Sequence, residues 1–234
     1  MKKIILFFVE GYHDRIEIQS ILNMPLFDDF RKKYRVEYIE SIGDITSDYR
    51  HTVDNIVSII ELEIKRWIKN TNGIVRSDIA MVIQLIDTDG AFVPESQVVF
   101  GDTLDPIYEN SRIVTNNVNS ICKRNASKSK KIRRLLIKKN LYNIPFELFF
   151  VSCNMEHVMY DKPNATKGDK HKYQTYFVYD CAHDDDFLYT NFLSDNCKST
   201  STYNESWDWI QEGTNSLSRH TNFNLFLEEN MRSN

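Results

Sequence analysis

Acidic side chains follow two apolar segments of this chain, at positions that suit metal-dependent chemistry. The apolar run 4–9 ends at Glu10. The nearly apolar run 79–86 ends at Asp87 and, two positions further, Asp89. Side chains alternate along an extended backbone, so the two aspartates can point the same way and reach one cation. Carboxylate oxygens are the ligands that Mg²⁺ favours, with Mn²⁺ as an alternative, and the sequence therefore predicts a metal site here.

Apolar patterning predicts the strands and helices that would carry these residues. Strands are expected at 4–9, at the alternating segment 35–40 and at 79–86, with one-faced apolar helices at about 16–22 and 53–69. The order strand, helix, strand, helix, strand predicts a parallel sheet with right-handed crossovers. Because such strands end on one side of the sheet, we expect Glu10, Asp87 and Asp89 to share that edge.

The chain after residue 90 is predicted to contain an insertion, a basic helix, a last strand and a helical extension. The insertion spans about 91–122, the basic helix about 123–140 and the strand 145–152. A helix is expected to start near 153–160, followed by a polar, loop-like segment at 162–169. We therefore predict an α/β domain at 1–160 and a mainly helical extension, 161–234, packed on it.

The residues around both acidic strand ends resemble the Toprim domain. That domain is shared by topoisomerases, primases, and the nucleases of the overcoming-lysogenization-defect and abortive-infection groups. The resemblance rests on Val9-Glu10-Gly11-x-x-Asp14 and on Asp87-x-Asp89 after an apolar strand, and it covers roughly residues 3 to 160. A further segment, Ser152-x-Asn154-x-Glu156-His157-Val158-x-Tyr160, is similar to one that follows the last sheet strand in smaller defence-associated Toprim-like proteins.

The resemblance implies a role for each acidic residue. Glu10 would be the general acid/base or a metal ligand, and Asp87 and Asp89 would hold Mg²⁺. Asp14 would support the same or a second metal, and Glu156 would complete that second site. The site would hydrolyse phosphodiester bonds of DNA or RNA, because Mg²⁺ offsets the charge on the attacking and leaving oxygens while a carboxylate moves the proton. The resemblance also suggests a role in phage defence beside a separate ATPase.

Two other interpretations of these residues stay open. Ile86-Asp87-Thr88-Asp89-Gly90 also resembles the first motif of haloacid-dehalogenase-type phosphatases, in which the first aspartate is a nucleophile and the second an acid/base. Ser152 would then belong to the second motif, a lysine near 167–172 to the third, and Asp184-Asp185 to the fourth. In that family the first motif normally opens the fold, whereas here two strand-helix units precede it. The remaining interpretation is a Toprim-like module that binds without cutting.

Cations crowd the predicted basic helix, although the whole chain has a formal net charge of −4. This local excess favours contact with a phosphate backbone over a merely solvated helix face. The residues predicted to make that contact are Lys128, Lys130, Lys131, Arg133, Arg134 and Lys138.

Composition places the chain among globular proteins of the cytoplasm. The four cysteines form no Cys-x-x-Cys pair, which argues against a zinc ribbon and favours reduced thiols. No apolar run approaches the roughly 20 residues of a membrane span, so we expect no membrane association. The sequence does not predict an oligomeric state.

Overall fold

The computed structural model describes residues 2–231, which form two compact units. The first unit comprises residues 2–86, 130–149 and 230–231. The second comprises residues 87–129 and 150–229. Within the described residues, no helix combines the length and the apolar character that crossing a membrane would require.

The first unit is built on a sheet of five strands in the order β2-β1-β3-β8-β7. β1 pairs in parallel with both β2 and β3, with Phe8 beside Ile39 on one side and Gln84 on the other. β1 is therefore an internal strand, which explains why Ile4 to Val9 are all buried. The strands are β1 (Lys3–Phe8), β2 (Tyr34–Ile39), β3 (Ile79–Asp87), β7 (Asn140–Leu141) and β8 (Ile144–Val151).

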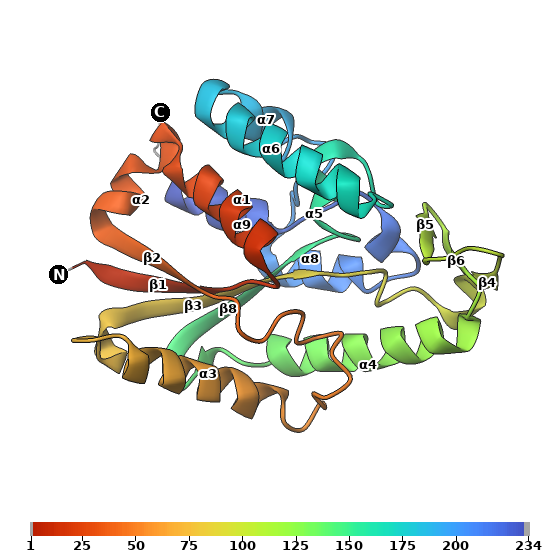
Figure 1. The fold of residues 1–234 in the computed structure, drawn as a ribbon, viewed down its shortest axis with the longest axis horizontal. Helices are drawn as coiled ribbons and strands as arrows, with labels where there is room; N and C mark the ends of the chain where they lie inside the picture. Colours follow the sequence, from red (N-terminus) through yellow and green to blue (C-terminus); the bar gives the residue numbers. More distant parts are fainter. Residues whose placement is uncertain (1, 232–234) are drawn as a thin grey trace. The chain divides into compact units, whose positions relative to one another are not determined.

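Helices cover both faces of this sheet, with α1 and α3 on opposite sides (Figure 1). The α3 helix buries Ile56, Ile60 and Ile64, which recur at the spacing of one helical face. The predicted α/β class with a mostly parallel central sheet flanked by helices is confirmed. The helical segments are α1 (Tyr12–Asn23), η1 (Pro25–Phe27), α2 (Asp28–Lys33), α3 (Ile56–Asn70) and η2 (Arg76–Asp78).

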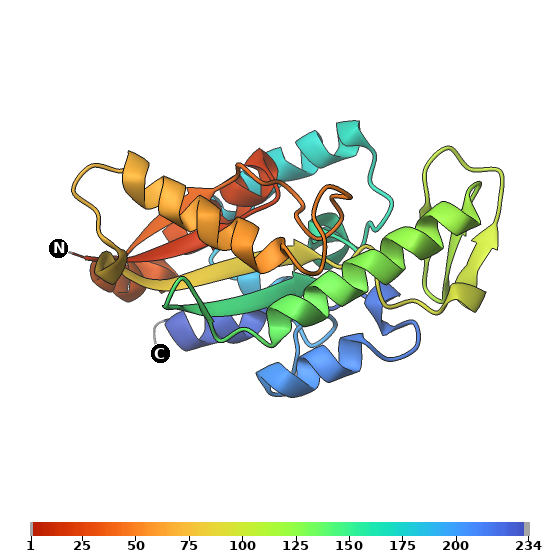
Figure 2. The same cartoon turned by 90° about the horizontal axis from the view of Figure 1, so that it is seen from below.

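The second unit contains a smaller sheet and most of the later helices. Its strands have the order β4-β6-β5, and the start of α4 lies beside them (Figure 2). Buried side chains, among them Val98, Ile113, Ile121 and Leu217, form one core cluster there. The elements are η3 (Glu95–Gln97), β4 (Val98–Phe100), β5 (Ile107–Glu109), β6 (Arg112–Thr115), α4 (Val118–Leu136), α5 (Met155–Tyr160), α6 (Lys167–His183), α7 (Phe187–Thr190), α8 (Tyr203–Ile210), η4 (Asn215–Leu217) and α9 (Phe223–Asn230). The division between the units falls within α4, whose residues from 130 onward belong to the first unit.

Residues 167–169 were expected to be loop but begin α6. The Thr166 side chain accepts a hydrogen bond from the Asp169 N–H at 3.2 Å, and Asp169 Oδ2 accepts one from the Thr166 N–H at 3.1 Å. This reciprocal pair is a capping box, which starts a helix despite the polar composition of the segment. The spacing Thr-x-x-Asp was visible in the sequence and was the signal for this helix start.

The two compact units follow a different division of the chain from the boundary predicted near residue 160. The small sheet lies in the predicted insertion, 91–122. The predicted basic helix, 123–140, is wrong at both ends, because α4 begins earlier, at Val118, and ends at Leu136, and Asn140 already belongs to β7. The division into 1–160 and 161–234 stays a prediction, and its residues 232–234 lie outside the described part of the chain.

Gly90 provides a stability test of the turn after β3. Its φ is +67°, and a Cβ there would lie 2.9 Å from Ile113 Cδ1 inside the core cluster. We expect Gly90→Ala to lower the free energy of unfolding by about 3 kcal/mol, through left-handed strain plus overpacking. In the control Gly213→Ala, φ is +51° but no atom lies within 4 Å, so we expect a loss of only about 1 kcal/mol. Equal losses in urea denaturation would contradict the close packing at Gly90.

Candidate functional site

Glu10 and Asp14 lie in the first unit, where β1 leads into α1. The Val9 N–H donates to Ile39 O at 3.1 Å, so sheet pairing extends to the residue before Glu10. Glu10 itself is half-buried. Asp14 Oδ2 accepts a hydrogen bond from the Gly11 N–H at 2.9 Å, which satisfies a donor that the helix start would leave without a partner. Asp14 therefore has a structural role at the helix start besides its predicted role at a metal.

Hydrogen bonds connect the backbone just after β3 to the last residue of β8 and the backbone after it, within the second unit. The Thr88 N–H donates to Val151 O and the Asp89 N–H to Cys153 O, both at 3.0 Å. The Cys153 N–H donates in turn to Thr88 Oγ1 at 3.0 Å. Asp89 and Cys153 have φ values of +47° and +52°, a left-handed conformation that is uncommon outside glycine. Such residues persist only where their surroundings hold them, and they concentrate at functional sites.

Polar side chains of α4 hold the turn after β3. Arg124 Nη2 donates to Asp89 O at 2.7 Å, and Asn125 Nδ2 donates to Gly90 O at 3.1 Å. One turn further along the helix, Lys128 Nζ lies 2.5 Å from Asp89 Oδ2. We refer to these five residues, Asp89, Gly90, Arg124, Asn125 and Lys128, as the Asp89 clasp.

The ion pair of the clasp is buried mainly on its cationic side. The Lys128 side chain is 0% exposed and that of Asp89 is 24% exposed. An ammonium group withdrawn from water is costly unless an opposite charge and hydrogen bonds compensate it. The Asp89 carboxylate supplies this compensation, so the pair fixes both the side chain of Asp89 and the position of α4 at the turn.

Burial separates the residues that were predicted to bind nucleic acid into two groups. Lys128 is bound within the clasp, and Lys131, which is 1% exposed, donates to Asp48 O at 2.8 Å. A buried ammonium group cannot reach a phosphate, so the structure argues against direct nucleic-acid contact by these two lysines. Four of the predicted residues keep exposed or partly exposed side chains: Lys130, Arg133, Arg134 and Lys138.

The charges of Asp87 and Asp89 act on one buried thiol. Burial raises the pKa of Cys153, and the negative charges of Asp89 and then Asp87 raise it further, so this cysteine stays protonated. Burial together with the charge of Asp89 also raises the pKa of Tyr108 to about 12. The hydroxyl of Tyr108 accepts a hydrogen bond from Arg124 Nη1 at 3.1 Å, which joins this tyrosine to the clasp.

Glu156 lies in the first turn of α5, after the helix cap Asn154. Its side chain is 10% exposed, and its Oε2 lies 3.2 Å from Lys170 Nζ of α6. The neighbouring His157 places Nδ1 3.2 Å from Ser152 O, and burial lowers the pKa of its imidazole. His157 is therefore neutral near pH 7 and acts as a structural hydrogen-bonding group.

The predicted metal ligands suit Mg²⁺ in their chemistry, since all are carboxylates. Glu10 and Asp14 belong to the first unit, and Asp87, Asp89 and Glu156 to the second. Among residues 2–231, no three His, Cys, Asp or Glu side chains are grouped so that they could hold a metal ion. Asp14, Asp89 and Glu156 each have a protein donor, so a metal bound there would share or displace that donor.

The structural part of this site was not predicted from the sequence. Arg124 was counted only as one cation of a basic run, and Asn125 and Tyr108 were not identified. The available signal was helical spacing, because Arg124 and Lys128 lie four residues apart on one face. Their partner, the backbone and side chain of Asp89, could be found only from the tertiary structure.

No protein-family model matches the chain, and no curated protein or solved structure matches it either. The fold defines an α/β protein with a mostly parallel central sheet. The resemblance to Toprim domains therefore rests on the short motifs and on the strands that carry them.

The Asp89 clasp predicts strong energetic coupling between Asp89 and Lys128. We expect Asp89→Asn to lower the free energy of unfolding by about 2 kcal/mol, since it removes the negative charge beside a buried ammonium while partial exposure of Asp89 moderates the loss. Lys128→Met should cost about 1 kcal/mol, and the double variant should be no less stable than Asp89→Asn alone.

The control for this double-mutant cycle is Lys130→Met, an exposed position on the same helix, which should change stability by less than about 0.5 kcal/mol. Strictly additive losses for Asp89→Asn and Lys128→Met in denaturant unfolding would show that the two side chains are not paired.

Proposed function

We propose that the protein is a Mg²⁺-dependent nuclease of the Toprim type that hydrolyses phosphodiester bonds in DNA or RNA. The observation that carries the proposal is that β1 and β3 are parallel neighbours in the sheet. Glu10 follows the carboxyl end of β1, and Asp87 ends β3. In open α/β sheets, ligands bind outside the carboxyl ends of such strands.

The chain's own residues divide the work of this proposed reaction. Asp87 and Asp89 hold the metal, and Glu10 acts as the general acid/base or as a further ligand. The clasp contributes by fixing Asp89, because the left-handed backbone of Asp89 and the ion pair with Lys128 restrict the carboxylate of Asp89. When bound, Mg²⁺ or Mn²⁺ offsets the charge that develops on the phosphate oxygens. Asp14 and Glu156 would support a second ion.

Exposed cations near the end of α4 provide a nucleic-acid surface in this proposal. Lys130 and Arg133 are exposed, and Arg134 and Lys138 are partly exposed. Each cation near a phosphate releases condensed counterions, so affinity falls as salt rises. The resemblance extends the proposal to phage defence in the cytoplasm, beside a separate ATPase.

One specific observation favours a phosphatase as the second candidate. Ser152 follows β8, the neighbour of β3, and its buried Oγ has no hydrogen-bond partner among the described residues. An orphan hydroxyl of this kind could bind a phosphoryl oxygen beside a nucleophilic Asp87. Against it, Lys170 of the expected lysine segment pairs with Glu156, and Asp184 lies exposed at the end of α6.

Cleavage assays with plasmid DNA and RNA, in Mg²⁺, Mn²⁺ or EDTA, test the nuclease. We expect metal-dependent cleavage, and at least about a 100-fold loss of rate in Glu10→Gln and in Asp87→Asn, since one loses a proton-transfer group and the other a metal ligand. Glu229→Gln, an exposed carboxylate in α9, is the matched control and should retain the wild-type rate.

The same variants separate the candidates. Metal-dependent cleavage that survives Glu10→Gln would contradict the nuclease. Hydrolysis of a phosphate ester with a trapped phospho-aspartate at Asp87 would establish the phosphatase instead. Binding of nucleic acid without turnover by the protein, with and without an ATPase partner, would favour the non-catalytic module.

Salt dependence tests the nucleic-acid surface on α4. We expect Lys130→Gln and Arg133→Gln each to reduce the slope of log K against log salt by about 0.9 for duplex DNA, because each removes one phosphate contact. Lys69→Gln, an exposed cation at the end of α3, is the control and should leave the slope unchanged. Fluorescence anisotropy between about 50 and 200 mM salt measures the slope. Unchanged slopes in both α4 variants would remove these residues from the surface.

A further inference from the structure

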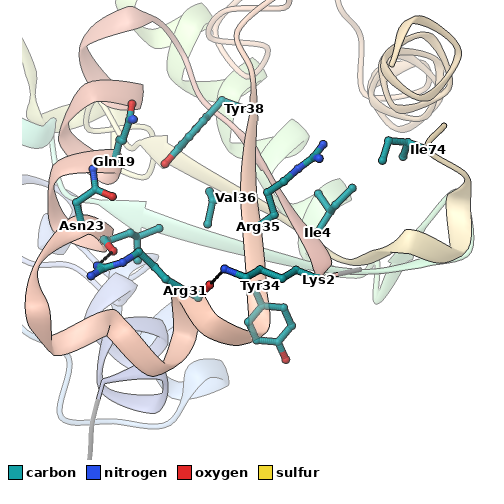
Figure 3. A pocket seen from close by; sticks show the side chains of 11 residues that line it. Lys2, Ile4, Gln19, Asn23, Arg31, Tyr34, Arg35, Val36, Tyr38 and Ile74 are labelled. Carbon is teal, nitrogen blue, oxygen red and sulfur yellow. Dashed lines mark hydrogen bonds between the residues drawn. The ribbon is translucent and has the colours of Figure 1, made fainter. Parts of the chain in front are cut away.

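β2 is an edge strand beside an open cavity of about 420 Å³ (Figure 3). The cavity is lined by residues from β1, β2, α1 and α2 and includes side chains from both sides of the strand. Figure 3 shows Val36 and Tyr38 on one side of β2 and Arg35 on the other. Because the cavity is open beside β2, the helices of this unit leave the outer edge of the strand uncovered.

The backbone of β2 alternates between its neighbour and this open side. Ile39 O accepts a hydrogen bond from Val9 N–H at 3.1 Å, so the polar backbone groups of Ile39 face β1. Since successive residues of a strand face opposite ways, Val36 directs its N–H and C=O to the outer side. Among the described residues, no strand pairs with β2 on that side. Edge strands of this kind are templates for pairing with another chain.

The sequence of β2 is self-complementary when it is read in opposite directions. It runs Tyr34-Arg35-Val36-Glu37-Tyr38, which is symmetric in residue type about Val36 except that a cation mirrors an anion. We infer that two copies of this chain associate through antiparallel pairing of β2, with Val36 at the two-fold axis. Val36 then exchanges both backbone hydrogen bonds with Val36 of the second copy, and Tyr34 does so with Tyr38 of the second copy.

Charge complementarity selects this partner and this register. Arg35 lies opposite Glu37 of the second copy in a non-hydrogen-bonded pair, where facing side chains are closest. Within one copy Arg35 Nε already lies 2.8 Å from Glu37 Oε1, so pairing creates a cluster of four alternating charges. A shift by one residue would turn the apolar and aromatic side chains to the wrong face, which disfavours that slip.

The tyrosines of β2 are already ordered for such pairing. Tyr34 packs on Phe30 with ring centroids 5.2 Å apart, and Tyr38 stacks on Phe7 at 6.0 Å. Little side-chain entropy is therefore lost when the second strand docks. The interface is isologous and small, so the dimer is reversible and depends on concentration. This inference does not rest on the proposed nuclease activity.

Sedimentation equilibrium of the full chain, from about 1 to 500 µM, tests the dimer. We expect the wild-type protein to dimerise reversibly and Val36→Pro to stay monomeric, because proline removes an outward N–H that the monomer does not use in its sheet. Val36→Thr keeps that N–H and the β-branched shape, and it should dimerise as the wild type does. Circular dichroism verifies that each variant is folded.

Charge reversals provide a second test that leaves the backbone intact. Arg35→Glu places like charges opposite each other at both symmetric positions, and so does Glu37→Arg, so each should weaken the dimer by about tenfold or more. An equimolar mixture of the two single variants should form a heterodimer of wild-type affinity. The double variant, in which both charges are exchanged, should form a homodimer of wild-type affinity.

Three outcomes would overturn the inference. One is a wild-type protein that is monomeric throughout the concentration range, which would leave the edge to a different partner. Another is a folded Val36→Pro that dimerises like the wild type. The last is a mixture of the two charge variants that associates no better than either variant alone.

Discussion

Burial of the Lys128 ammonium beside the Asp89 carboxylate is a constraint that the second unit has to satisfy. The Lys128 side chain has no access to water, so its charge must be compensated inside the protein, and the Asp89 carboxylate contributes to this compensation. This requirement fixes the turn after β3 against α4, together with the backbone bonds from Arg124 and Asn125. Gly90, in the same turn, lies close to Ile113 of the core cluster, so the turn also packs beside the small sheet.

The same interaction limits what the candidate site can do. An aspartate that already pairs with a lysine is restrained, which favours a defined geometry for a ligand. The lysine also neutralises part of the negative charge that the aspartate could offer to a metal ion. Asp14 and Glu156 also have partners already: Asp14 caps the start of α1, and Glu156 forms an ion pair with Lys170. In the proposed reaction Asp87, the last residue of β3, would hold the metal together with Asp89, so the restraint on Asp89 bears directly on that role.

The two outer features of the chain, the basic helix and the edge strand, differ in how their charges are used. In α4, some cations are directed inward to stabilise the fold, while Lys130 and Arg133 stay on the surface. In β2, the charges of Arg35 and Glu37 are balanced within the strand and can be balanced again by a second copy. Charge counted along a sequence thus predicts neither surface by itself, because burial decides which charges can meet a partner.

The sequence by itself determined the class of fold and the strand ends that carry carboxylates. Apolar periodicity was sufficient because β1, β3 and β8 are buried, and burial imposes a pattern that short windows of sequence reveal. The start of α6 was also encoded locally, in the capping box of Thr166 and Asp169, although composition suggested a loop. Only the tertiary structure decided which lysines are buried. It also decided that Lys128 pairs with Asp89, which lies 39 positions away in the chain. The reason is physical: a local pattern records which side of an element is apolar, whereas an ion pair between distant segments exists only after the chain has packed.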